Sequence, residues 1–99
     1  MAANTIYKVL IVNIKSPEEI FFQGEADAIS SVNEAGNFDV LPLHTNFISL
    51  IQKTLVIYQQ GQKLKEMQIE AGIIKVTNNN VNIFLGIESF SQPTPSPKT

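Results

Sequence analysis

Cysteine is absent from this 99-residue chain, and charged residues are few. Without cysteine the protein can form neither a disulfide scaffold nor a cysteine-ligated metal site. Charged residues make up 16% of the chain, below the usual share of about a quarter. This low share favours either a surface covered by a partner or a surface rich in Asn, Gln, Ser and Thr. The net charge of −2 provides no large positive field, which argues against nucleic-acid binding.

Long apolar runs and phosphate-binding motifs are also missing. No apolar stretch approaches the ~20 residues that a membrane-spanning helix needs. The beginning of the chain, MAANTIYK, lacks the basic region and long apolar core of a signal peptide. The five glycines stand apart, so none of them belongs to a glycine-rich phosphate loop. We therefore expect a cytoplasmic chain that binds no nucleotide by itself and reaches a membrane only through partners.

The residues that catalysis would need are too few and too scattered. The single histidine, His44, could be combined with Asp39 and Ser49 into a hydrolytic triad, but a triad is defined by a geometry that spacing does not show. A surface or interface histidine that makes hydrogen bonds is the simpler interpretation. One histidine and scattered asparagines do not make a metal site. The sequence thus predicts no catalytic residue, no metal and no cofactor.

What the sequence does contain is a series of short β-type segments separated by turns. β-Branched residues dominate the first segment, Tyr7 to Ile14, and its apolar residues occupy both faces, as in a strand covered on both sides. No helical period persists for ten residues. The pattern predicts an all-β fold, an antiparallel β-sandwich of about eight to ten short strands over residues 1–90. The expected strands include 7–14, 20–24, 26–32, 38–41, 47–51, 55–58, 64–69, 73–77 and 81–85.

Turn-forming residues mark the boundaries of these strands. Asn78-Asn79-Asn80 is the strongest turn signal, because asparagine tolerates a left-handed backbone. Gly24, inside an apolar run, indicates a bulge or a close backbone approach. The tail from residue 91 reads SQPTPSPKT and contains no apolar residue. A segment of this composition cannot offset its ordering entropy by burial, so residues 91–99 are expected to be a disordered, proline-rich tail.

The most informative stretch runs from Asn33 to Ile51, NEAGNFDVLPLHTNFISLI. A turn signal at Gly36 leads into a short apolar piece, which Pro42 then ends. Proline cannot donate a hydrogen bond to a sheet ladder, so the chain is expected to leave the sheet at this point. The segment from Leu41 to His44 should form a stiff surface loop, and surface loops often carry binding residues.

The order of these motifs resembles the N-terminal domain of the epsilon subunit of F-type ATP synthases. A Val/Ile-rich strand comes first, followed by Phe22-Gln23-Gly24, the turn at Gly36 and Leu41-Pro42-Leu43-His44. An apolar strand at Phe47, a glycine at Gly72 and a closing strand from Val81 to Leu85 complete the order. The chain departs from the family at Leu43, Asp39, Asn37 and Thr45-Asn46. The tail prolines stand in place of the family's C-terminal helical hairpin, so we expect no such hairpin.

The resemblance implies a mechanical function without catalysis. The sandwich would link the gamma subunit to the rotor ring of the central stalk, as a peripheral protein on the cytoplasmic face of the inner (plasma) membrane, and would help couple proton transport to ATP synthesis. The turn at Gly36, Asn37 and Phe38 would face the rotor ring, whereas His44, Thr45 and Asn46 would lie toward gamma. The alternative is a stand-alone β-sandwich that binds a peptide or protein along a free sheet edge.

Overall fold

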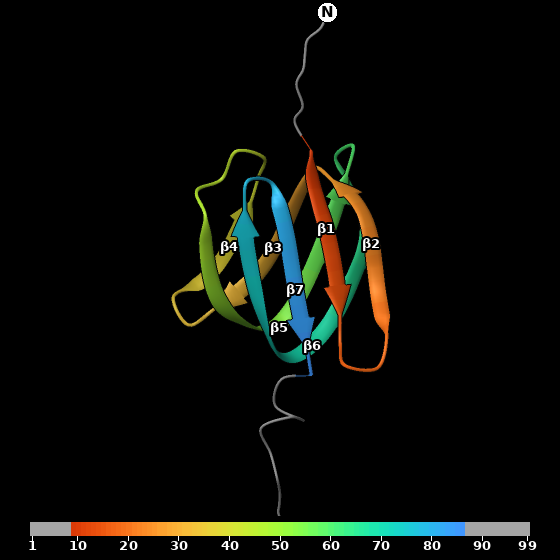
Figure 1. Cartoon of the computed structure of the whole chain (residues 1–99). Coiled ribbons are helices and arrows are strands. Elements are labelled where there is room, and N and C mark those ends of the chain that lie inside the picture. The colour runs from red at the N-terminus through yellow and green to blue at the C-terminus, as the bar shows by residue number, and fades with distance from the viewer. Residues whose placement is uncertain (1–8, 87–99) are drawn as a thin grey trace, which may run out of the picture.

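The computed structural model describes residues 9–86, and this part of the chain contains strands and no helix (Figure 1). None of its segments is therefore a helix long and apolar enough to cross a membrane. The expected tail, residues 91–99, and the first eight residues lie outside the described residues. The strands are β1 (Leu10–Lys15), β2 (Ile20–Ala26), β3 (Ala28–Asn33), β4 (Gly36–Val40), β5 (Phe47–Gln59), β6 (Gln62–Thr77) and β7 (Asn80–Leu85).

The seven strands form one mixed sheet in the order β2-β1-β7-β6-β5-β3-β4. All neighbouring pairs are antiparallel except β1 and β7, which run parallel with Ile11 opposite Asn80 and Lys15 opposite Phe84. The expectation of a purely antiparallel sheet is therefore corrected at this pair. Parallel neighbours need a long crossover, and here nearly the whole described chain lies between the two strands. Side-chain alternation is the same in both directions, so it could not indicate this pairing.

β5 and β6 are far longer than the expected strands, with 13 and 16 residues. Each combines two segments that the sequence pattern separated, which reduces the expected eight to ten short strands to seven. The junction is irregular: Ile51 pairs with Gly72, but Lys53 pairs with Ile69. Lys53 also has a positive φ of 73°. Such a bulge bends the hairpin without ending it, although the polar residues there resemble a turn in the sequence.

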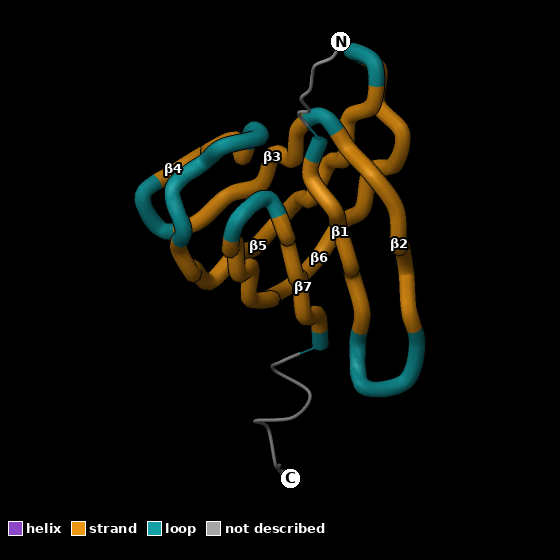
Figure 2. The backbone as a smooth tube through the Cα atoms, turned by 45° about the horizontal axis from the view of Figure 1, so that its top comes forward, coloured by secondary structure: helices purple, strands orange, loops and turns teal. Residues whose placement is uncertain are grey.

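Because of this bend, one half of the β5–β6 hairpin belongs to one layer of a sandwich and the other half belongs to the second layer (Figures 1 and 2). β7 pairs with β6 only from Gly72 to Thr77, so this half continues into β7, β1 and β2. β3 pairs with β5 only between Gln52 and Tyr58, and this half continues into β3 and β4. Inward-facing aliphatic side chains from all seven strands fill the space between the layers. The fully buried ones include Leu10, Val12, Ile14, Ile29, Val40, Leu55, Ile74, Val76, Val81 and Ile83.

β1 was expected to be buried on both faces, but only one of its faces is buried. Leu10, Val12 and Ile14 are completely buried, but Ile11 points away from the core and is 42% exposed.

The remaining turns agree with the sequence pattern. Asn78 and Asn79 have φ of 49° and 66°, the left-handed conformation expected of them. Gly24 lies opposite Val12 in a regular part of the β1–β2 ladder, so it is not a bulge. It is a close approach, because a Cβ there would lie 3.2 Å from the ring of Phe22.

Candidate functional site

β4 ends at Val40, so the chain leaves the sheet two residues before Pro42, close to the position that the sequence predicts. The loop from Leu41 to Asn46 is held in place by asparagines. The backbone N–H of Leu43 donates to Oδ1 of Asn79 at 2.7 Å. The N–H of Asn78 donates to Oδ1 of Asn46 at 2.9 Å. These bonds fix the loop against the β6–β7 turn, which lies next to it in Figure 2. These tertiary contacts therefore restrain the loop in addition to the fixed φ of the proline.

His44 is half-buried at the base of this loop. Its Nδ1 lies 2.7 Å from the carbonyl oxygen of Thr45, and its ring centroid lies 4.9 Å from that of Phe47. A carbonyl oxygen only accepts, so Nδ1 carries the proton in this bond. In neutral imidazole Nε2 is then the acceptor and is the nitrogen that remains for another group.

The hydrolytic triad considered from the sequence is not assembled. Nδ1 of His44 is occupied by the Thr45 carbonyl. The Ser49 hydroxyl donates to the Leu50 carbonyl and accepts from the Asn33 amide at 3.2 Å. The Asp39 carboxylate accepts a hydrogen bond from the Ser30 hydroxyl. Within residues 9–86, no three His, Cys, Asp or Glu side chains cluster as metal ligands would.

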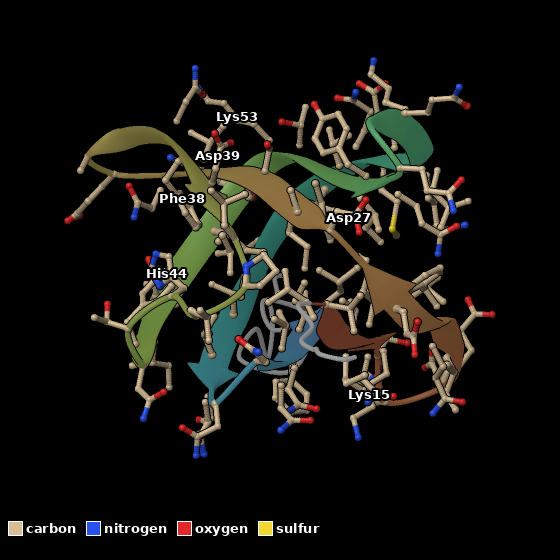
Figure 3. All side chains as sticks on the ribbon, turned by 90° about the horizontal axis from the view of Figure 1, so that it is seen from above. Lys15, Asp27, Phe38, Asp39, His44 and Lys53 are labelled. Atoms are coloured by element: carbon tan, nitrogen blue, oxygen red, sulfur yellow. The ribbon has the colours of Figure 1, made fainter. Side chains whose placement is uncertain are left out.

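The other predicted group lies at the opposite end of β4, where β3 turns into β4. Gly36 has a φ of 121°, which a side chain rarely tolerates, and Asn37 is exposed. Phe38 is instead half-buried and packs on the core. Its ring meets that of Phe47 edge-on, with centroids 5.9 Å apart. Figure 3 shows Phe38 and His44 on the same side of the molecule. The two groups thus lie at the two ends of one strand and are joined through the ring of Phe47.

A further surface was missed by the sequence analysis, and we call it the outer apolar face. One register row crosses five strands: Leu50 pairs with Ile73, Ile73 with Phe84, Phe84 with Lys15, and Lys15 with Ile20. Leu50 is 70% exposed and Ile20 58% exposed. The ammonium of Lys15 lies 5.4 Å from the centroid of the Phe84 ring, within range of a cation–π interaction. The face consists of Ile20, Ile48, Leu50, Ile73 and Phe84.

Apolar side chains gathered in this way on the outside of a sheet mark interaction sites more often than scattered ones do. Ile48, in the neighbouring row, is 65% exposed and pairs with Lys75. The signal in the sequence was the pair Ile48 and Leu50, which leaves apolar residues on both faces of that strand and by itself favours burial within the fold. The partner strands that bring these residues into one row could not be inferred from the sequence.

Comparisons with a family model and with known proteins point to the same family. The family model of the ATP synthase delta/epsilon chain, beta-sandwich domain, matches residues 9–86. ATP synthase epsilon chains from Leptospira borgpetersenii serovar Hardjo-bovis (strain JB197) and Endomicrobium trichonymphae are 34% and 33% identical over 75% and 73% of this chain. The matches cover 58% and 52% of those two proteins, so this chain spans little more than half of their length.

Solved structures share the fold. The chain is similar to one in the mitochondrial ATP synthase of Euglena gracilis, an assembly of OSCP, F1 and c-ring, with a TM-score of 0.73 and 20% identity over 85% of this chain and 54% of that one. A chain from the central stalk and c-ring of the Tetrahymena thermophila enzyme matches with a TM-score of 0.64 and 13% identity, over 77% of this chain and 62% of that one. The family model spans every described strand, and the chain therefore belongs to the delta/epsilon family of ATP synthase subunits through its β-sandwich domain.

Proposed function

We propose that this chain is the β-sandwich part of an epsilon subunit in the central stalk of a rotary ATP synthase. It would be a non-catalytic subunit that links gamma to the rotor ring and helps couple proton transport to ATP synthesis. The observation that carries this proposal is the family match over residues 9–86, which includes all seven strands. The alternative, a stand-alone peptide-binding sandwich, is not favoured, because the relatives and the structural neighbours come from ATP synthases.

The arrangement of surfaces supports a role as a linker. The turn at Gly36 and Asn37 and the loop with His44, Thr45 and Asn46 lie at opposite ends of β4. A chain with contact groups at two ends can hold two partners at the same time. We assign the Gly36 end to the rotor ring and the His44 end to gamma, and through these partners the chain would sit on the cytoplasmic face of the inner membrane.

The outer apolar face adds a surface that a partner could cover. Its exposed Ile48 and Leu50 on β5 follow directly after the loop with His44. Apolar area removed from water contributes roughly 25 cal/mol per Å², whereas single polar contacts contribute little. We therefore place gamma over this face and the adjoining loop. Lys15 and Lys75 at the same face favour an acidic rim on the partner.

The test is to titrate the purified chain with the gamma subunit and with the detergent-solubilised rotor ring of the same complex. Ile48→Asp should weaken gamma binding by about tenfold or more, because it places a charge in an apolar contact. Gln68→Asp, an exposed change on β6 outside that face, should bind as the parent does. A chain that binds neither gamma nor the ring would overturn the proposed function. Equal binding by the Ile48 variant would remove the outer apolar face from the contact.

A further inference from the structure

Within residues 9–86, the most exposed large apolar side chain belongs to Leu43, in the loop between β4 and β5. It is 76% exposed, and Leu41 in the same loop is 54% exposed. Residues 41–44 form a β-turn, which is closed by a hydrogen bond of 3.1 Å from the N–H of His44 to the carbonyl oxygen of Leu41. Pro42 is the second residue of this turn and Leu43 is the third. The turn therefore holds the leucine side chain in solvent.

The backbone of Leu43 adopts a conformation that leucine seldom takes. Its φ is 70°, in the left-handed region, whereas Pro42 before it has the negative φ that its ring imposes. A negative φ followed by a positive one defines a type II turn, and the third position of such a turn is usually glycine or asparagine. Leucine is strained there, because its Cβ lies too close to the carbonyl oxygen that follows. Asparagine at position 43 would therefore suit the turn better than leucine does.

The contacts that hold the loop act on its backbone and not on the Leu43 side chain. The N–H of Leu43 donates to Oδ1 of Asn79 at 2.7 Å. Any residue with a backbone N–H at position 43 can make this bond. The side chain gains little from the fold, since most of its surface remains in water. Strain that the fold itself does not use is typical of positions that serve binding.

The surroundings of the turn indicate the chemistry of a partner. The loop is already fixed against the β6–β7 turn, so it loses little conformational freedom when another protein docks. Residues 40–52 contain no Asp, Glu, Lys or Arg. β5 follows the loop directly and carries Ile48 of the outer apolar face, which is 65% exposed. A partner that covers this stretch must therefore present an apolar, uncharged surface.

We propose that Leu43 is an apolar anchor of the contact with gamma and that its side chain enters a pocket of aliphatic or aromatic side chains on that subunit. This inference rests on the proposed function, which places gamma over the loop and the outer apolar face. Burial of a leucine side chain removes apolar area from water and favours binding. A side-chain amide in the same pocket would lose its hydrogen bonds to water without replacing them. The residue that suits the turn best is thus the one that suits the pocket least.

The experiment measures folding and binding on the same variants of the whole chain. Leu43→Asn should unfold at a higher urea concentration than the parent, because asparagine tolerates the positive φ. In calorimetric titrations with purified gamma, its Kd should be at least about tenfold higher than that of the parent. Leu43→Met is the matched control, since it keeps both an apolar side chain of similar volume and the strained backbone. Its Kd should stay within about threefold of the parent, and its urea midpoint should hardly move.

Three results would overturn this proposal. The first is a Leu43→Asn chain that binds gamma as tightly as the parent, and the second is a Leu43→Met chain that binds as weakly as Leu43→Asn. The third is a Leu43→Asn chain that unfolds at a lower urea concentration than the parent, because the leucine would then serve the fold. In each case the proposed function stands if the parent chain binds gamma. A parent chain that binds neither gamma nor the rotor ring would overturn both.

Discussion

Asn79 and Leu43 are 36 residues apart in the sequence and are joined by a 2.7 Å hydrogen bond from the Leu43 N–H to the Asn79 side-chain oxygen. The backbone oxygen of Asn79 also accepts from the N–H of Ile11 at 2.8 Å. One residue of the β6–β7 turn therefore positions both the β4–β5 loop and the first strand. Leu43 itself has a φ of 70°, an uncommon conformation for a branched side chain, which this bond helps to maintain.

Replacing Asn79 by Gly should lower the free energy of unfolding by about 0.5–1.5 kcal/mol, because glycine keeps the left-handed backbone and removes only the acceptor. Asn79→Asp, which retains an oxygen at this position, should stay within about 0.5 kcal/mol of the parent. Urea unfolding followed by circular dichroism measures both. If the Gly and Asp variants unfold at the same urea concentration, the bond to Leu43 contributes nothing to stability.

Substitutions at His44 separate its two ring nitrogens. His44→Asn can still donate to the Thr45 carbonyl in place of Nδ1, so it should fold nearly as the parent does and lose the contact with gamma that we propose for Nε2. His44→Gln, which presents its amide further out, should lose about 1 kcal/mol of stability and retain more of the binding. Thermal melts and calorimetric titration with gamma give the two quantities. Binding that is unchanged in every His44 variant would exclude the histidine from the interface.

Glycine is needed at position 36 because of the backbone conformation there, and not because a side chain would lack space. Its φ is 121°, and a Cβ built there would meet no atom within 4 Å. Gly36→Val should therefore lower the free energy of unfolding by about 1–3 kcal/mol through backbone strain alone. Ala35→Ser, an exposed change at the neighbouring position, should have an effect within about 0.5 kcal/mol. A Gly36→Val variant as stable as the parent would mean that the turn relaxes to a conformation without strain.

The pKa of Lys63 should depend on one carboxylate, that of Glu66. The hydrogen bond and the charge of Glu66 raise the pKa of Lys63 above its ordinary value. Because the pKa of Lys63 is higher in the folded state, its charge stabilises the fold. This stabilisation is fully present at a pH below the lysine pKa of the unfolded state, and it is lost as the pH rises through the lysine pKa of the folded state. Glu66→Gln should lower the Lys63 pKa, measured by NMR titration, whereas Glu70→Gln should leave it unchanged. Both groups are exposed, so stability at neutral pH should hardly differ.

Local residue patterns were enough to specify the fold class and most of the turns. Alternation with a period of two is a local property, so the buried Val81, Ile83 and Leu85 of β7 could be recognised from a single segment. Proline at position 42 and the asparagines at 78 and 79 act through their own backbone preferences, and the chain turns where they stand. The order of these local signals was also sufficient for the family resemblance, which the family model confirms.

The choice of neighbouring strands, in contrast, was made by the packing of the whole molecule. The parallel pairing of β1 with β7, the bulge that joins two expected strands into β6, and the row from Leu50 to Ile20 each depend on contacts between distant segments. A strand carries no local record of its partner's direction or identity, because that choice depends on how the core as a whole is filled. For the same reason, an opening lined by Glu34, Leu50 and Glu70 has no signature in the sequence, because 36 residues separate the two glutamates that the bend in the hairpin brings to its walls.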